Sequence, residues 1–471
     1  MSGIHRRKFI KTIAGGSIAT YLSGASVAQN KGQDVRKRPN IIFLLTDDQR
    51  WDVMGCMGNP IIKTPNMDDM ASNGVLFNNA YVTTPICCSS RASILTGQFA
   101  RRHGIHDFTT NFSEKALAET YPILLRNAGY RTGFVGKYGI ANTEETMPKD
   151  RFDVWYGFPG QSQYEQKDAD GNPRHLTSIL GDQSLDFLQG CSADQPFSLS
   201  VSFKAPHVQD EDLRQFIPDP AYMDLYKDDT IPVPETADQR YFDAFPEFLK
   251  TNSEARDRWK IRYATPEMYQ RSVKNYYRLI SGVDKVIGDI RNELDRLGFA
   301  DNTVIILMGD NGFYLGEHGF AGKWYGHEES IRVPLIICDP RMKGDMKGRV
   351  SNDIALNIDI APTILALAGL VTPAGMNGKN LYARLYGGTL TWRRDFLFEH
   401  HFTHDKIPKS EGVISLRYKY MRYIEQNPVY EELYDLKNDP HEVRNLATDG
   451  SYLSMLAGMR KRCDELIDRA I

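Results

Sequence analysis

The sequence predicts an α/β protein whose core is a sheet of buried parallel strands, followed by a smaller α+β region. Residues 40–45 and 304–308 are continuously apolar and β-prone, which is typical of strands buried on both faces. Each run stops at polar residues, Asp47-Asp48 and Asp310-Asn311, so potential ligands stand at the strand ends where open α/β sheets bind them. Residues 266–297 have the apolar spacing of a long helix that leads into the second strand.

The N-terminus is predicted to be an export signal rather than part of the fold. Arg6-Arg7 precede a weakly apolar run of small residues at 13–28, which ends in the cleavable-looking Ser26-Val27-Ala28. The run is too short and too rich in small residues to span a membrane. We therefore expect a twin-arginine signal peptide at 1–28, a linker at 29–38, the twin-arginine translocase as a partner, and a periplasmic or secreted protein without membrane attachment after processing. A disordered basic tail is the alternative.

The chain is long enough for one large domain and a smaller one. Its 471 residues exceed the size at which a single hydrophobic core stops growing. Its net charge of −3 comes from mixed acidic and basic residues, which gives no indication of a nucleic-acid partner. The six cysteines lack metal-finger spacing, and their number does not decide whether a disulfide forms. An anionic substrate would need a local basic pocket.

The helix expected at residues 266–297 is the clearest single element. Apolar residues follow it in steps of four and three, namely Tyr269, Val273, Tyr276, Ile280, Val283, Ile287, Ile290 and Leu294. This stripe predicts packing on the sheet and no function of its own. Residues 207–263 are rich in Pro, Asp and aromatics without sustained periodicity, so we expect long surface loops that border a site.

The pattern changes near residue 381. Short β-prone runs follow at 395–398, 412–416 and 418–424, with a terminal helix from about Ser451. The sequence therefore predicts a large α/β domain at residues 39–380 and a C-terminal α+β subdomain at residues 381–471.

The two strand ends predict a metal site. Asp47, Asp48, Asp310 and Asn311 form an all-oxygen, strongly anionic set. Such a set suits a hard cation, calcium or magnesium.

The segment Cys87-Cys88-Ser89-Ser90-Arg91, continuing to Leu95-Thr96-Gly97, resembles the first signature of the type I sulfatases, the formylglycine-dependent sulfatases of the alkaline phosphatase superfamily. The register, a cysteine four residues before an arginine, selects Cys87. The resemblance implies that a maturing enzyme oxidises Cys87 to formylglycine, whose hydrate supplies the attacking oxygen, and that calcium is bound by the strand-end residues and residue 87. Magnesium is the chemical alternative.

The spacing of this signature has a physical rationale. A nucleophile at a helix N-terminus meets free backbone N–H groups and the positive end of the helix dipole, which favour a sulfate. Arg91 lies one turn along on the same face, so it can hold charged oxygens at the same place.

A second signature match runs from Gly129 to Lys137, and Lys137 maps onto the family's sulfate-side lysine. The family pattern continues with an aromatic residue and a histidine, whereas this chain has Tyr138-Gly139. The residue that helps to eliminate sulfate is therefore missing. His103, His106 or Lys137 acting through water are the candidates to replace it.

A third conserved stretch is resembled by the segment from Asp310 through Lys323 to Leu335. Lys323 maps onto the lysine that contacts the ester bridge oxygen, and His207 onto the histidine that can protonate the leaving alcohol. We interpret His318 as structural. A C-terminal hallmark matches residues 432–446, so the resemblance covers residues 39–446.

The resemblance implies a large mixed, mostly parallel sheet sandwiched by helices, and a smaller C-terminal domain with an antiparallel sheet. It implies sulfate ester hydrolysis in which calcium, Arg91, Lys137 and Lys323 neutralise the sulfate while His207 or Lys323 protonates the alcohol. The expected substrate is a sulfated polysaccharide or its oligosaccharides, with His400 and His401 at the carbohydrate subsites. A phosphate or phosphonate ester hydrolase remains an alternative. A catalytically weak glycan-binding homologue is another, because Gly139 and Ser89 depart from the family pattern.

Overall fold

A computed structural model describes residues 38–140, 143–168, 170–388 and 391–471. The predicted signal peptide and the predicted linker up to residue 37 lie outside the described residues. Within the described ranges, no helix is both long enough and apolar enough to cross a membrane.

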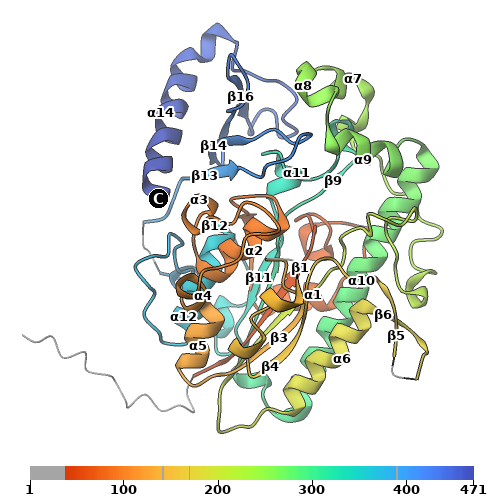
Figure 1. The fold of residues 1–471 in the computed structure, drawn as a ribbon, viewed down its shortest axis with the longest axis vertical. Coiled ribbons are helices and arrows are strands. Elements are labelled where there is room, and N and C mark those ends of the chain that lie inside the picture. Colours follow the sequence, from red (N-terminus) through yellow and green to blue (C-terminus); the bar gives the residue numbers. More distant parts are fainter. Residues whose placement is uncertain (1–37, 141–142, 169, 389–390) are drawn as a thin grey trace, which may run out of the picture. The chain divides into compact units, whose positions relative to one another are not determined.

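The large sheet has eight strands, in the order β12-β2-β11-β8-β1-β7-β3-β4 (Figure 1). The strands are β1 (Asn40–Thr46), β2 (Val75–Tyr81), β3 (Arg131–Lys137), β4 (Val154–Phe158), β7 (Phe197–Ser202), β8 (Thr303–Gly309), β11 (Leu335–Cys338) and β12 (Arg349–Leu356). Only the pairings of β11 with β2 and with β8 are antiparallel in this sheet. The predicted mixed, mostly parallel sheet is confirmed, and β1 and β8 are adjacent and parallel.

Side chains of β1 alternate between two hydrophobic cores, because successive residues of a strand point to opposite faces. Ile41, Phe43 and Leu45 belong to one core, and Ile42 and Leu44 to the other. Figure 1 shows helices α6 and α10 covering one face of the sheet and α2, α5 and α12 the other. The helices are α1 (Pro65–Ser72), α2 (Cys87–Thr96), α3 (Ala100–His103), α4 (Glu114–Ala118), α5 (Tyr121–Asn127), α6 (Leu176–Gln189), α7 (Gln239–Asp243), α8 (Glu247–Lys250), α9 (Glu254–Arg262), α10 (Pro266–Leu297), α11 (Glu328–Ile331), α12 (Ile360–Leu367), α13 (Tyr382–Leu385) and α14 (Leu453–Ala470).

Helix α10 has the predicted limits. It begins after Thr265, whose side chain accepts a hydrogen bond from Met268 N, and has proline at its first position. It ends before Gly298, whose φ of 73° lies in the left-handed region that glycine tolerates. All eight residues of the predicted apolar stripe are buried.

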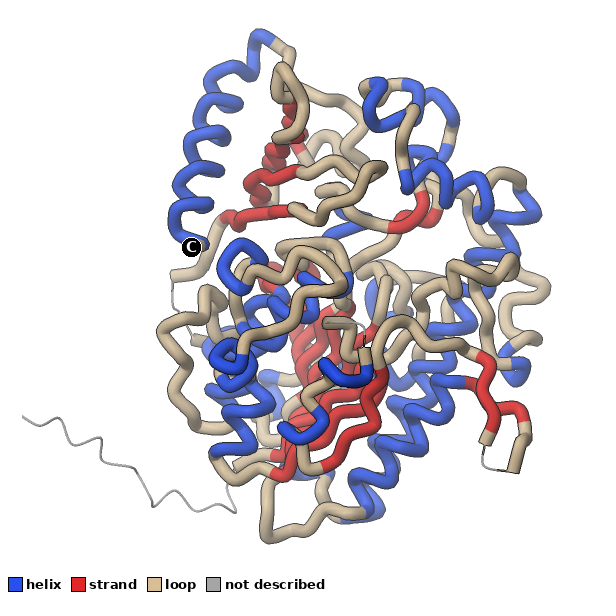
Figure 2. The backbone as a smooth tube through the Cα atoms, in the orientation of Figure 1, coloured by secondary structure: helices blue, strands red, loops and turns tan. Residues whose placement is uncertain are grey.

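The C-terminal region forms a separate four-stranded antiparallel sheet, β13-β14-β15-β16, seen with α14 beside it in Figure 2. Its strands are β13 (Asp395–His400), β14 (Ser410–Ser415), β15 (Tyr418–Tyr423) and β16 (Tyr430–Asp435). Leu397, Val413 and Leu433 of the sheet share a core with Leu456 and Cys463 of α14. The predicted antiparallel subdomain is confirmed, while its boundary at residue 380 stays a prediction.

Residues 207–263 differ in part from the predicted loops, because α7, α8 and α9 lie within them. Helix α9 could not be predicted from apolar spacing, because it buries only Ala255 and Arg262. Its stability comes from a Ser253 cap that accepts from Arg256 N and from the ion pair of Glu254 with Arg258. Two short hairpins complete the described strands, β5 (Glu165–Lys167) with β6 (Pro173–His175) and β9 (Tyr314–Leu315) with β10 (Ala321–Gly322).

Candidate active site

The ends of β1 and β8 bring the predicted metal ligands together. Asp48 N donates to Asp310 Oδ1 at 3.1 Å, and Asn311 Nδ2 donates to Asp48 Oδ1 at 2.5 Å. Asp48 has a φ of 64°, a left-handed conformation that aspartate tolerates better than most residues and that is found at strained functional sites. Asp47, Asp48, Asp310 and Asn311 are all buried. The turn after β1 therefore places two successive carboxylates in one buried cluster.

Cys87 is the first residue of α2, as the signature spacing predicts. No side chain caps this helix, so its N-terminal backbone N–H groups are left for a ligand. The Cys87 thiol donates to Asp47 Oδ1 at 3.2 Å, and Lys323 Nζ donates to Cys87 Sγ at 3.1 Å. Burial, with Asp47 nearby, raises the pKa of this thiol far above its usual range. An unmodified Cys87 is therefore a protonated thiol and a poor nucleophile.

Three buried cations face the carboxylates. Arg91 donates through Nε to Asp310 Oδ2 at 2.8 Å and through Nη2 to Asp47 Oδ2 at 3.2 Å. Lys137 donates to Asp47, and Lys323 donates to Asp48. Burial opposes the charge of both lysines, but the facing carboxylates outweigh it and raise the pKa of each lysine. All three cations are therefore charged at neutral pH.

The carboxylates differ in their titration. Burial alone would raise the pKa of Asp47, but the charges of Lys137 and Arg91 outweigh it and hold that pKa well below its usual range. Burial, together with repulsion from Asp47 and Asp310, raises the pKa of Asp48 to about 7 despite the attraction of Lys323. The cluster is thus strained by excess negative charge at Asp48, which a bound cation would relieve.

The geometry of His207 fixes its tautomer. Its Nδ1 lies 2.7 Å from Val208 O, and a carbonyl only accepts, so Nδ1 carries the hydrogen. Its Nε2 lies 3.5 Å from Asp48 Oδ2 and 3.4 Å from Gln161 Nε2. Burial holds the pKa of His207 well below its usual range, so Nε2 is an acceptor in this state.

The donor set fits a hard metal ion. One ligand atom from each of Asp47, Asp48, Cys87 and His207 lies within 4.8 Å of the others. Asn311 Oδ1 is buried and has no hydrogen-bond partner among the described residues, as expected of an oxygen that awaits a cation. Both Asp310 oxygens accept hydrogen bonds from the protein, so Asp310 would ligate through its remaining lone pairs. Carboxylate and amide oxygens favour calcium or magnesium.

A pocket of about 390 Å³ opens on this cluster. Its lining combines four predicted catalytic residues with residues that were not predicted individually, and the latter include Phe108, Gln161, Asp210, Arg258, Trp324, Phe402 and His404. Trp324 carried a usable sequence signal, because it directly follows Lys323, and Asp210 and Arg258 lie within residues 207–263, which the sequence predicts to border a site. The others belong to segments without periodicity, which the long-range fold brings to the pocket.

Some predicted residues lie elsewhere. His400 is fully buried at the end of β13, and His401 Nε2 lies 3.4 Å from Glu411 Oε2. Neither lines the pocket, and their substrate-binding role stays a prediction. His103 and His106 are also outside the lining, and His103 bonds through Nε2 to Ser93 Oγ at 3.0 Å and through Nδ1 to Ile105 N at 3.0 Å. His103 is thus occupied by a structural role.

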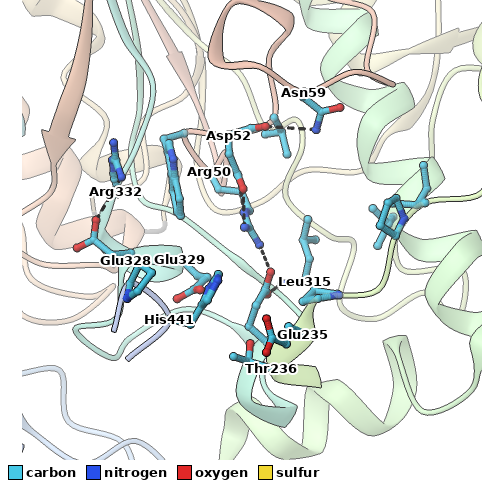
Figure 3. Close-up of a pocket in the computed structure, with 18 of the residues that line it drawn as sticks. Arg50, Asp52, Asn59, Glu235, Thr236, Leu315, Glu328, Glu329, Arg332 and His441 are labelled. Carbon is cyan, nitrogen blue, oxygen red and sulfur yellow. Dashed lines mark hydrogen bonds and ion pairs between the residues drawn. The ribbon is translucent and has the colours of Figure 1, made fainter. Parts of the chain in front are cut away.

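A second cavity, of about 560 Å³, is lined by Arg50 and none of the predicted catalytic residues (Figure 3). Arg50 is bound on one side by Asp52 and on the other by Glu317. Glu329 also lines this Arg50 cavity, and its Oε2 is buried without a hydrogen-bond partner within the described residues. This cavity therefore presents acidic groups, which disfavour an anionic substrate.

Comparison with known proteins agrees with the geometry. The family model described as Sulfatase matches residues 39–370, and that of the N-sulphoglucosamine sulphohydrolase C-terminal region matches residues 316–469. An N-acetylglucosamine-6-O-sulfatase of Bacteroides thetaiotaomicron is 30% identical over 497 residues, covering 92% of this chain and 86% of the relative. The human N-acetylglucosamine-6-sulfatase is 28% identical over 87% of this chain and 80% of its own.

Among solved structures, one in complex with its substrate D-glucosamine-2-N,6-O-disulfate has a TM-score of 0.77 and 26% identity. The similarity covers 92% of this chain and 98% of that chain. Together with the match of the family model over most of the chain, these findings show that the chain belongs to the sulfatase family, whose members hydrolyse sulfuric esters.

Proposed function

We propose that the chain is an exported, formylglycine- and calcium-dependent sulfatase that hydrolyses a sulfate ester on a glucosamine-type sugar of a sulfated glycan. The observation that carries this proposal is the setting of Cys87. It stands at an uncapped helix N-terminus, hydrogen-bonded to Asp47 and Lys323, at the base of a pocket also lined by Lys137 and His207. The named substrates of the relatives supply the sugar class.

Formylglycine at residue 87, when formed, supplies a hydrated aldehyde whose oxygen attacks sulfur. The chain's own groups bind and orient the ester. Lys137 and Lys323 line the pocket and carry positive charge toward the sulfate oxygens. Arg91 is held against Asp47 and Asp310, so it fixes the carboxylates rather than reaching into the pocket. The combined positive charge of Lys137, Lys323 and Arg91 offsets the negative charge that builds up on the sulfate.

Calcium would be held by Asp47, Asp48, Asp310, Asn311 and residue 87, and it would neutralise sulfate charge as a Lewis acid. The open acceptor of Asn311 and the raised pKa of Asp48 support a cation at this position. Both lysines now pair with Asp47 or Asp48. A metal that takes over these carboxylates would leave the lysines available to sulfate.

The S–O bond to the sugar breaks toward the sugar oxygen, which must receive a proton. His207 and Lys323 both line the pocket and are the donors that we assign to this step. His207 already holds its Nδ1 hydrogen on Val208 O, so a proton taken up at Nε2 faces the pocket side of the ring, toward Gln161. Breaking the ester then leaves a neutral alcohol.

Gly139 leaves the second half of the reaction without the family's histidine. A Cβ at residue 139 would lie 2.6 Å from Arg91 Cδ, and the φ of 75° disfavours any side chain. A histidine at residue 139 would therefore be strained and would have to displace the Arg91 side chain. His103 is occupied and His106 lies outside the pocket, which leaves Lys137 acting through water. Because its raised pKa keeps Lys137 protonated, Lys137 would hold the water that accepts the proton rather than accept the proton itself.

Export by a twin-arginine signal at residues 1–28 is part of the proposal and rests on the sequence pattern alone. Fusing residues 1–38 to a reporter that folds in the cytoplasm tests it. We expect the reporter in the periplasm or medium and, when Arg6 and Arg7 are replaced by lysine, in the cytoplasm. Export of both fusions would refute the twin-arginine route.

The enzymatic proposal is tested by comparing turnover of N-acetylglucosamine-6-sulfate, an aryl sulfate and an aryl phosphonate by the calcium-loaded protein. We expect the highest kcat/KM on the sulfated sugar and a measurable rate on the aryl sulfate. A higher kcat/KM on the phosphonate would favour the phosphonate hydrolase alternative. Binding of the sulfated sugar without turnover, with residue 87 fully modified, would favour the glycan-binding alternative.

A further inference from the structure

The segment between β4 and β5 forms a fixed turn beside the active-site pocket. Gly160 has a φ of 62° and Ser162 a φ of 49°, and the latter is unusual for a residue with a side chain. Lys204 Nζ donates to Ser162 O at 2.6 Å, and Tyr164 OH donates to His207 O at 2.6 Å. These contacts tie the turn to the segment that carries His207. Backbone strain of this kind persists only where the surroundings hold it, and it clusters at functional sites.

Gln161 lies between the two left-handed residues, and its side chain lines the pocket. Its Nε2 is 3.4 Å from His207 Nε2, which accepts when the ring is neutral and carries its single hydrogen on Nδ1. The amide therefore points its donor at His207. Its Oε1 is buried and has no hydrogen-bond partner in the part of the chain that the structure describes. A buried acceptor without a partner costs free energy, which a ligand that donates to it would recover.

We propose that Gln161 is a specificity-determining residue that accepts a hydrogen bond from a hydroxyl or N–H group of the sugar bearing the sulfate. This rests on the proposed sulfatase function. Nε2 and Oε1 of Gln161 are bonded to the same carbon atom. A sugar group that donates to Oε1 therefore lies beside the His207 ring, which is proposed to protonate the leaving oxygen. A sugar ring offers such donors next to its sulfate ester, whereas a simple aryl sulfate offers none.

The test compares Gln161→Met with wild type on N-acetylglucosamine-6-sulfate and on 4-nitrophenyl sulfate. Methionine keeps the length of the side chain and removes the amide. We expect kcat/KM on the sugar to fall by about 10- to 100-fold, the usual effect of losing a buried hydrogen bond to a substrate, while kcat/KM on the aryl sulfate changes by less than about threefold. Gln163→Met, at an exposed position of the same turn, is the matched control and should change neither value.

Monodeoxy analogues of the sugar then identify the donor. For one analogue, wild type and Gln161→Met should have kcat/KM values within about threefold of each other, because the hydrogen bond is absent in both. Equal losses on both substrates would show that Gln161 acts only by orienting His207 and would overturn the proposal, as would unchanged rates on both. A wild type that hydrolyses neither sulfate ester would instead contradict the sulfatase function itself. The retained rate of Gln161→Met on the aryl sulfate shows that the variant is folded, so a loss confined to the sugar is a loss of the contact.

Discussion

The active-site pocket and the Arg50 cavity are both built from segments that follow strands of the large sheet, yet only one suits an anionic substrate. In the pocket, Lys137 and Lys323 pair with carboxylates that a metal ion would also bind, so their charge can change partners. In the Arg50 cavity, the guanidinium is held by Asp52 and Glu317, which lie outside the metal cluster. We therefore assign the reaction to the cavity with the smaller volume, about 390 Å³ against about 560 Å³.

We infer that ion pairs whose partners can be exchanged, rather than the volume of a cavity, indicate where an anionic substrate binds. A buried pair whose partners are fixed contributes little beyond avoiding an unpaired charge. A buried pair whose partner can leave becomes a binding site. The comparison predicts that substitutions at the pocket abolish turnover, whereas substitutions at the Arg50 cavity change stability.

The largest expected effect is that of Cys87→Ala. It removes the attacking group, and we expect kcat on the sulfated sugar to fall by at least about a thousandfold while the melting temperature stays near that of wild type. Cys88→Ala, one residue along the same helix and outside the pocket lining, is the matched control and should keep most of the activity. Full turnover by Cys87→Ala would show that residue 87 does not supply the attacking group and that the pocket is not distinguished from the Arg50 cavity.

Removal of the metal should have the next largest effect. We expect chelation to lower kcat/KM by roughly a hundredfold or more, because a Lewis acid contributes several kcal/mol to such a reaction, and calcium to restore it better than zinc. Asp310→Ala should lose bound calcium as well as rate, as measured by elemental analysis of the purified protein. Asp301→Ala, at an exposed position before the same strand, should lose neither. A metal-free protein with full turnover would contradict the site.

At the Arg50 cavity we expect a loss of stability instead. Arg50→Met leaves the buried carboxylate of Glu317 without its partner, which should lower the free energy of unfolding by about 3 kcal/mol, measured by denaturant titration. The double variant Arg50→Met with Glu317→Met removes both charges and should recover part of this loss. The kcat/KM of each folded variant should stay within about threefold of wild type. A hundredfold loss of turnover in the folded variants would erase the distinction between the two cavities.

The smallest expected effect is a pH-dependent one at Glu329. Burial, and then repulsion from Glu317 and Glu442, raises the pKa of this carboxyl well above its ordinary 4.5. The folded protein therefore keeps a proton that the unfolded chain releases above pH 4.5, so stability from this group falls as the pH rises toward the folded pKa. Glu329→Gln has no such component, and its melting temperature relative to wild type should increase between pH 5 and pH 8. A constant or decreasing difference would show that Glu329 is ionised in the cavity.

Several elements could be predicted because their information is local. The strands β1 and β8 and the helix α10 follow from apolar runs and spacing, and the convergence of Asp48 with Asp310 follows from the adjacency of parallel strand ends. Cys87 at a helix start follows from its signature.

The rest of the pocket could not be predicted, because long-range contacts position it. Gln161 reaches the pocket through the bond from Lys204 to Ser162, and Asp210 is held by Arg258 and by Arg262 of α9. No spacing in the sequence encodes these pairings. His400 shows the opposite case. It was predicted at the carbohydrate subsites, but it lies buried in the interior at the end of β13.

The proposed role of residue 87 is tested most directly by the mass of the peptide that contains it, taken from active, calcium-loaded protein and compared with sulfate release by the same preparation. We expect formylglycine in place of Cys87, and a specific activity on N-acetylglucosamine-6-sulfate that rises in proportion to the modified fraction. Full activity from protein in which this peptide carries only unmodified cysteine would contradict this role.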